Sequence, residues 1–298
     1  MAAFRRAGLA VTLAAVLVEI IPLVSLAAGQ YAQVSDDLEL YYVDEGQGDP
    51  IVLIPGWTAS EVVFEHQIDH LAKTHHVIAY DPRSQGLSTK TLDNNSYAQH
   101  GRDLAGLLDK LGLRQVTLIG WSAACYDIWA YVRDQGTDNI KRIVCIDMPP
   151  VGLSADPTIW SGWSADEEGM LVLRGSFDLI GSDRQGLAFS LAQRMNARPL
   201  TPAETDWFIR QAMLTPTYAA LLLRADMLFS DYRLVAKDVD GKVPILYVLA
   251  EDNPSVAASW VKQNMPHAQI MSMKRHMSFW SEHDGFNAGL DAFLTSTP

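Results

Sequence analysis

Cysteine is scarce in this sequence: only Cys125 and Cys145 occur among 298 residues. Two cysteines are too few for a scaffold of several disulfides or for a zinc site made of thiolates. Each lies within a segment that we predict to belong to the core, so we expect buried thiols, and the sequence leaves a bridge between them open. Burial of apolar side chains must therefore supply the core.

Positive charge is also limited, because 23 Lys and Arg residues face 35 Asp and Glu residues, giving a formal net charge of -12. No cluster of basic residues is larger than an adjacent pair such as Arg5 and Arg6. Binding to nucleic acid needs a basic surface that neutralises phosphates, so we expect no nucleic-acid partner. An apolar content of 48% with charges of both signs excludes a disordered chain and is typical of globular proteins.

The sequence has no apolar run long enough for a stable membrane span, which requires ~20 residues. Its longest candidate, Ala7 to Val18, is followed by Glu19 and Pro22. A short basic segment precedes this run and small residues at 25–28 follow it, which is the pattern of a secretory leader. We therefore expect residues 1–28 to be a cleaved signal peptide and the protein to be exported, either periplasmic or secreted. A retained leader that tethers the protein to a membrane is the alternative.

Strand-like and helix-like segments alternate along the remaining chain. Short apolar runs closed by turn residues predict buried strands, and leucines at helical spacing predict helices between them. This alternation indicates an α/β fold with a mostly parallel sheet, helices on both faces, and a ligand site beyond the carboxyl ends of the strands. The predicted strands are 51–54, 76–80, 115–120, 142–146, 243–249 and 269–273, and the clearest helices are 97–111, 123–133 and 282–294.

The stretch 149–226 departs from this alternation, because it contains no strand-like run and many aromatic and methionine residues in helical segments. An insertion of this kind between two strands predicts a helical lid over the site. The predicted organisation is thus a core of residues 29–148 and 227–298 with a lid of residues 149–226. Most lid aromatics are expected to pack within the lid, and some to line a pocket.

A serine lies in the segment Gly120-Trp121-Ser122-Ala123-Ala124, between a predicted strand and a predicted helix. A tight strand-turn-helix connection exposes a serine as a nucleophile, and small residues at its ends are needed where the two backbones crowd together. In this segment the chain resembles the α/β-hydrolase fold family, of the lid-bearing serine esterase or lactonase type. The family pattern ends in glycine where this chain has Ala124, which keeps the position small.

A serine nucleophile needs a base, and His276 directly follows the last predicted strand, where the family resemblance implies the catalytic histidine. The resemblance implies an acid after either of two strands. Asp147 follows the strand that ends at 146, and Asp252 follows the strand that ends near 249, so both stay candidates. An Asp without this role would act as a helix cap or turn residue.

The resemblance also implies an oxyanion hole made by the backbone N–H groups of Trp57 and Ala123. It implies no cofactor. We predict no metal site either, since His66 and His70 have the i, i+4 spacing of a metal pair but lack the glutamate of a zinc-protease helix. These two histidines are better explained as part of a solvated helix face.

The resulting hypothesis is a serine hydrolase that cleaves a carboxylic ester or lactone of a small, largely apolar substrate through an acyl-enzyme. Cofactor-free perhydrolysis would be a side activity of the same triad. Serine at position 122 argues against dehalogenase and epoxide-hydrolase chemistry, which in this fold use aspartate, and against thiol chemistry. The alternative is a non-catalytic ligand-binding protein of the same fold.

Overall fold

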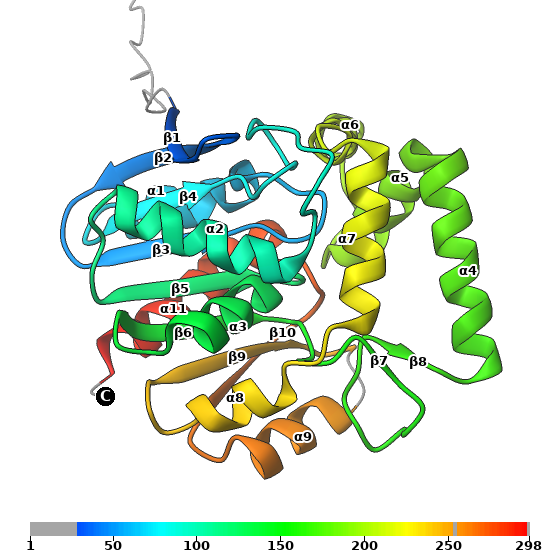
Figure 1. Ribbon diagram of the computed structural model, residues 1–298. Coiled ribbons are helices and arrows are strands. Elements are labelled where there is room, and N and C mark those ends of the chain that lie inside the picture. The colour runs from blue at the N-terminus through cyan, green and yellow to red at the C-terminus, as the bar shows by residue number, and fades with distance from the viewer. Residues whose placement is uncertain (1–28, 253–254, 297–298) are drawn as a thin grey trace, which may run out of the picture.

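A computed structural model describes residues 29–252 and 255–296 of the chain. The predicted leader, residues 1–28, lies outside the described residues. The described chain forms an eight-stranded sheet in the order β1-β2-β4-β3-β5-β6-β9-β10 (Figure 1). Strands β3 to β10 pair in parallel, whereas β2 is antiparallel to both of its neighbours. The predicted α/β class with a mostly parallel sheet is confirmed.

Six strands follow the order of the predicted alternation, with shifts of one or two residues at several ends. In five of them the central residues are buried on both faces, as expected for Val- and Ile-rich strands of a parallel sheet covered by helices. In the sixth, residues 269–273 at the sheet edge, the central residues are half-buried or exposed. These strands are β3 (Pro50–Ile54), β4 (His76–Tyr80), β5 (Val116–Trp121), β6 (Ile140–Ile146), β9 (Ile245–Ala250) and β10 (Gln269–Met273).

The hairpin at the sheet edge was not predicted from the sequence. It consists of β1 (Gln30–Ser35) and β2 (Leu38–Gly46), and its polar side chains alternate with buried Leu38, Leu40 and Tyr42. Such an edge strand has one solvated face and carries a weaker apolar signal than the continuous runs of the central strands.

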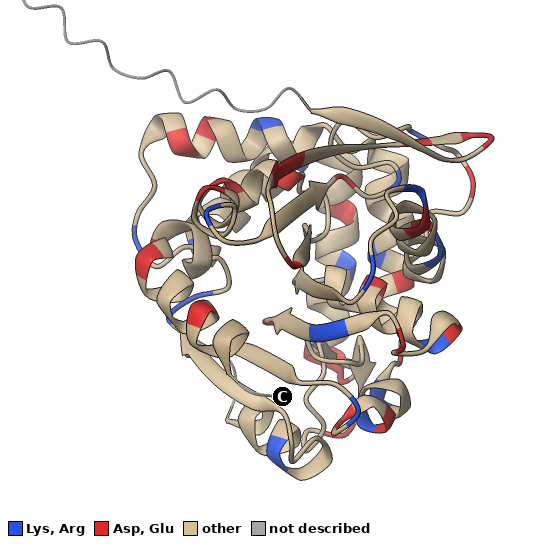
Figure 2. Cartoon of the chain, turned by 90° about the vertical axis from the view of Figure 1, so that its left-hand side faces the viewer, with Lys and Arg blue, Asp and Glu red and all other residues tan. Residues whose placement is uncertain are grey.

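Helices cover the two faces of the sheet and enclose two separate apolar cores (Figure 1). One face carries α2 (Tyr97–Lys110), α3 (Ala124–Gln135), α8 (Arg233–Val239) and α9 (Val256–Asn264). The other carries η1 (Glu61–Phe64), α1 (Glu65–Leu71), α10 (Ser278–Ser281) and α11 (His283–Thr295). In Figure 2 the Lys and Arg positions are dispersed among the Asp and Glu positions.

The insertion after β6 contains four helices that stand together at one side of the sheet (Figure 1). They are α4 (Glu167–Ser182), α5 (Arg184–Met195), α6 (Pro202–Met213) and α7 (Thr217–Phe229). The last of them continues three residues past the predicted lid boundary at 226. Before α4, the two-residue strands β7 (Leu153–Ser154) and β8 (Trp163–Ser164) form a small parallel pair that the sequence did not indicate. Two-residue strands are too short to produce a periodic signal.

Cys125 and Cys145 are fully buried, as predicted, but they are not free thiols. They form a disulfide, with their Cα atoms 5.5 Å apart. The bond joins the first turn of α3 to the end of β6. The two cysteines meet because β5 lies beside β6 and leads into α3. The sequence alone could not establish this proximity.

Within residues 29–252 and 255–296, no helix has both the length and the apolar character that crossing a membrane requires.

Candidate active site

Ser122 occupies the sharp turn between β5 and α3 with a φ of 55°, the left-handed region that costs energy for any residue but glycine. Its backbone N–H donates a 2.7 Å hydrogen bond to the carbonyl of Ile146 on the neighbouring strand, which anchors the turn. A Cβ on Gly120 would come within 2.9 Å of Ile128 and 3.0 Å of the Ala124 backbone. The predicted crowding of strand and helix is confirmed.

A second close approach places the loop after β3 against this turn. A Cβ on Gly56 would lie 3.0 Å from the Cβ of Ser122 and 3.0 Å from the carbonyl oxygen of Trp121. Gly56 therefore allows the backbone of the loop, including Trp57, to reach the serine.

The loop after β10 carries His276 to the same region. Its Nδ1 lies 2.6 Å from Oδ2 of Asp147. An ionised carboxylate only accepts hydrogen bonds, so Nδ1 is assigned as the donor, which leaves Nε2 able to accept a proton. The carbonyl of His276 also accepts a 2.9 Å bond from the indole of Trp121, which fixes the loop next to the serine turn.

Asp147 is held in place by the strands on which the site is built. It is 7% exposed, and its Oδ1 accepts a 3.0 Å hydrogen bond from the backbone N–H of Ala250 at the end of β9. Its own N–H donates a 2.8 Å bond to the carbonyl of Val248, and its φ of 55° turns the carboxylate toward the histidine.

Asp252, the other candidate acid, forms an ion pair with Arg275 in which both side chains are about half exposed. It lines the same cavity as Ser122 and His276, and its carboxylate accepts a hydrogen bond from Arg275. Of the two candidates, Asp147 is the one bonded to His276.

A cavity of about 470 Å³ lies between the ends of the strands and the lid, and Ser122, His276 and Asp147 line it. Its walls come from the core loops and from all four lid helices. Among the lid aromatics, Trp160, Trp163 and Phe208 line this cavity. Others, such as exposed Phe189, do not.

The loop around Trp57 is held by contacts on both sides. The side chain of Gln85 accepts a 2.7 Å bond from the N–H of Thr58 and donates a 3.2 Å bond to the carbonyl of Gly56. The indole of Trp57 donates a 2.9 Å bond to the carbonyl of Ala220 on α7. Across the described ranges, the backbone N–H groups of Trp57 and Ala123 have no acceptor in the protein. Both groups are thus available for a ligand oxygen.

Arg224 is a lining residue that sequence reasoning missed. It follows three leucines on α7, where no motif marks it. The only available signal was a lone arginine within a strongly apolar helical run, which is not specific.

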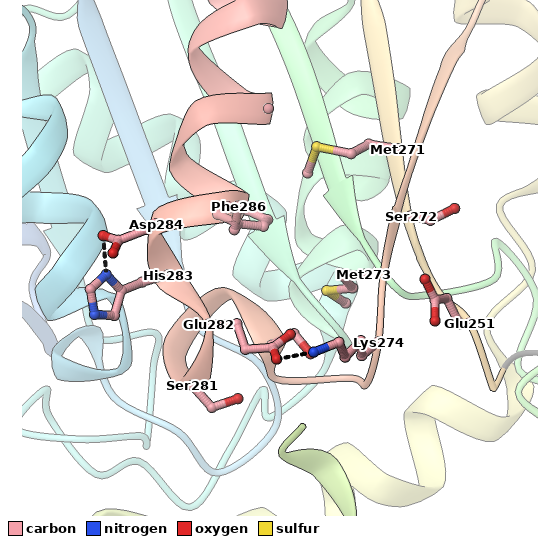
Figure 3. Close-up of a pocket in the computed structure, with 13 residues that line it drawn as sticks. Glu251, Met271, Ser272, Met273, Lys274, Ser281, Glu282, His283, Asp284 and Phe286 are labelled. Carbon is pink, nitrogen blue, oxygen red and sulfur yellow. Dashed lines mark hydrogen bonds and ion pairs between the residues drawn. The ribbon is translucent and has the colours of Figure 1, made fainter. Parts of the chain in front are cut away.

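The larger of the two cavities described, about 670 Å³, lies between β10 and α11 and contains none of the predicted catalytic residues (Figure 3). Within it Lys274 pairs with Glu282 and His283 contacts Asp284, whereas Glu251 in its lining forms no ion pair among the described residues.

The described residues contain no group of three or more His, Cys, Asp or Glu side chains arranged to hold a metal ion. His70 contacts Asp291 at 2.8 Å, and the ring of His66 packs 4.0 Å from that of His283. His66 and His70, the i, i+4 pair, therefore contact two different residues of α11.

The profile of the alpha/beta hydrolase fold family matches residues 49–265, and the chain belongs to this family. A non-heme chloroperoxidase, CPO-A1 of Kitasatospora aureofaciens, is 33% identical over 41% of this chain and 45% of its own length. The chain thus spans less than half of this curated relative, and 43% of a putative chloroperoxidase from Synechocystis.

Solved structures of the same fold include two hydrolases. The esterase EaEST from Exiguobacterium antarcticum has a TM-score of 0.81 at 20% identity and covers 90% of this chain and all of its own. The enol-lactonase from Burkholderia xenovorans LB400 has a TM-score of 0.74 at 19% identity, with the same coverage. At such identities the similarity establishes the fold, which the family match supports.

Proposed function

We propose that this protein is a serine hydrolase that cleaves a carboxylic ester or lactone through a triad of Ser122, His276 and Asp147. The observation that carries the proposal is the 2.6 Å contact between His276 and Asp147 in the cavity that Ser122 also lines. A nucleophile on a strained turn, a base, and an acid that orients the base are the parts that acyl transfer requires.

In the first half-reaction, Oγ of Ser122 attacks the carbonyl carbon while Nε2 of His276 takes the hydroxyl proton. Asp147 keeps the imidazole in the tautomer that accepts at Nε2 and stabilises the imidazolium. The carbonyl oxygen becomes an oxyanion that the N–H groups of Trp57 and Ala123 bind. The imidazolium then protonates the leaving alkoxide, and an acyl-enzyme remains.

In the second half-reaction, His276 removes a proton from water, which attacks the acyl carbon and restores Ser122. A lactone follows the same path, except that its leaving alkoxide stays attached to the acyl group. The names of the esterase and the enol-lactonase with this fold support both substrate types as candidates.

The test is hydrolysis of p-nitrophenyl esters of increasing chain length and of a lactone panel by purified residues 29–298. Ser122→Ala, prepared in parallel, is the control. We expect a burst of p-nitrophenol equal to the enzyme concentration, followed by turnover, and neither in Ser122→Ala. Tight binding of the same compounds without any serine-dependent turnover would contradict the proposal and favour a ligand-binding protein.

We also propose that the protein is exported. The buried disulfide between Cys125 and Cys145 supports this, because disulfides persist in oxidising compartments and are rare in the cytosol. N-terminal sequencing of the protein from its native cells, with a start near Gly29, is the expected result. An intact residue 1 would contradict cleavage of the leader.

A further inference from the structure

Arg224 projects from α7 into the active-site cavity beside the loop of the proposed oxyanion hole. Ala220, one helical turn earlier, accepts the hydrogen bond from the Trp57 indole. Residues i and i+4 share a helix face, so Arg224 faces the same loop. Its guanidinium carbon lies 5.6 Å from the ring centre of Trp57 and 4.1 Å from that of Trp163.

The guanidinium has few protein partners for a group so deeply placed. One amino group reaches Oγ of Ser176 at a long 3.4 Å, and Nε is buried without a hydrogen-bond partner. No carboxylate of the described residues forms an ion pair with it. Burial lowers the pKa of Arg224 to about 10, which still leaves it charged at neutral pH. A half-buried cation that has no counter-ion and whose Nε is buried without a partner is costly for folding, so its presence calls for an explanation.

The carboxylates that line the cavity or lie on α7 are engaged elsewhere. Asp226, two residues along α7, accepts a 2.7 Å bond from the backbone N–H of Tyr97. Asp147 bonds to His276 and Ala250, and Asp252 pairs with Arg275.

Two further arginines line the cavity, and within the described ranges neither forms an ion pair. Arg184 donates to the carbonyls of Ala212 and Thr215, and Arg194 to that of Ser190. With Asp252 paired to Arg275, the lining holds three arginines against the single carboxylate of Asp147, so its net charge is positive although the whole chain carries a formal charge of -12. A low-dielectric cleft with an excess of one sign of charge attracts ligands of the opposite sign.

We propose that Arg224 binds a carboxylate group of the substrate, so that the natural substrate is an ester or lactone with a free carboxylate. A guanidinium packed against aromatic rings donates its hydrogen bonds in its own plane, and a carboxylate matches this geometry with two acceptors. Trp57 and Trp163 would contact the apolar part of the substrate. The inference rests on the proposed hydrolase function and adds one charged group to the predicted apolar substrate.

The experiment compares matched neutral and anionic esters. On the acyl side, p-nitrophenyl pentanoate is paired with p-nitrophenyl hydrogen glutarate; on the alcohol side, 4-methylphenyl acetate is paired with 4-acetoxybenzoate. The measured quantity is the ratio of kcat/KM for the anionic ester to kcat/KM for its neutral partner. We expect one of the two pairs to favour the anion in the wild type, and Arg224→Gln to lower that ratio roughly 10- to 100-fold.

Two more variants separate binding from structure. Arg224→Lys keeps the charge and should retain part of the preference, whereas Arg174→Gln, an exposed arginine on α4, should leave the ratio at its wild-type value. Equal losses for neutral and anionic esters in Arg224→Gln would assign Arg224 a structural role and overturn the inference. So would wild-type hydrolysis with no preference for the anion in either pair.

A binding measurement distinguishes failure of the carboxylate-binding inference from failure of the proposed hydrolase function. Glutarate is titrated against tryptophan fluorescence, since Trp57 and Trp163 flank Arg224. If no ester shows Ser122-dependent hydrolysis, the function fails. Glutarate binding that Arg224→Gln abolishes would still uphold the carboxylate site, and binding that is absent or independent of Arg224 would overturn it.

Discussion

The backbone N–H of Ser122 donates a 2.7 Å hydrogen bond to the carbonyl of Ile146, the residue directly before Asp147. The turn that carries the proposed nucleophile and the residue that carries the proposed acid are thus tied through the ends of two adjacent parallel strands. Ser122 and Asp147 also share a φ of 55°. Strained backbone of this kind persists where the surrounding structure enforces it, and here both strained residues point into one cavity.

Asp147→Asn should lower kcat for ester hydrolysis by about a thousandfold or more, because an amide at this position favours the wrong imidazole tautomer. Asp252→Asn is the matched control. Its ion pair with Arg275 is half exposed, so we expect a change below about threefold. Steady-state kinetics of both variants checks this. Comparable losses in the two would contradict the assignment of Asp147 as the acid.

Gly56→Ala should reduce kcat/KM roughly 100-fold while the protein stays folded, because the new Cβ would lie 3.0 Å from Cβ of Ser122 and displace the loop. Gly175→Ala on α4 is the control, since a Cβ there meets nothing within 4 Å. The two variants are compared by kinetics and circular dichroism. Full activity of Gly56→Ala would show that the loop does not need this close approach.

Replacing both cysteines, Cys125→Ala together with Cys145→Ala, should lower the free energy of unfolding by about 2–4 kcal/mol. The disulfide closes a loop of 20 residues, which restricts the unfolded chain. Urea denaturation of the double variant and of the wild type, with and without reductant, measures the difference. A thiol titration of the denatured wild type should find no free thiol. An unchanged urea midpoint would be inconsistent with a stabilising bond.

The raised pKa of Glu61 predicts that the stability of the protein depends on pH. Burial, together with the neighbouring Asp81, raises the pKa of Glu61 to about 9. The folded chain therefore keeps a proton that the unfolded chain releases above its ordinary pKa near 4.5. The stabilisation from this retained proton is fully present below the unfolded-state pKa near 4.5. It is lost as the pH rises toward 9, by at most about 1.4 kcal/mol per pH unit for one proton.

Glu61→Gln isolates this effect, because the amide imitates the protonated carboxyl and does not titrate. Relative to this variant, the wild type should lose unfolding free energy between about pH 5.5 and pH 8.5. Burial also raises the pKa of Asp81, which acts in the same direction in both proteins. Urea denaturation at several pH values gives the comparison. Parallel stability curves for the two proteins would mean that Glu61 is already ionised in the folded state.

Local features of the site could be predicted from the sequence because they depend on neighbours in the chain. The apolar run of 115–120, the small residues around Ser122 and the following amphipathic segment together predict a strand, a turn and a helix. The position of His276 directly after a strand is likewise a local property. The β1–β2 hairpin was missed because its exposed face dilutes the apolar pattern by which strands are recognised.

Contacts between distant segments were decided by the tertiary structure alone. Asp147 and Asp252 both follow a strand in the sequence, and only the packing of β6, β9 and the loop after β10 brings one of them to His276. The same holds for the pairing of Cys125 with Cys145 and for the isolated guanidinium of Arg224. Local propensity acts over a few residues, whereas these distances depend on how strands and lid helices pack, which no single segment of the sequence encodes.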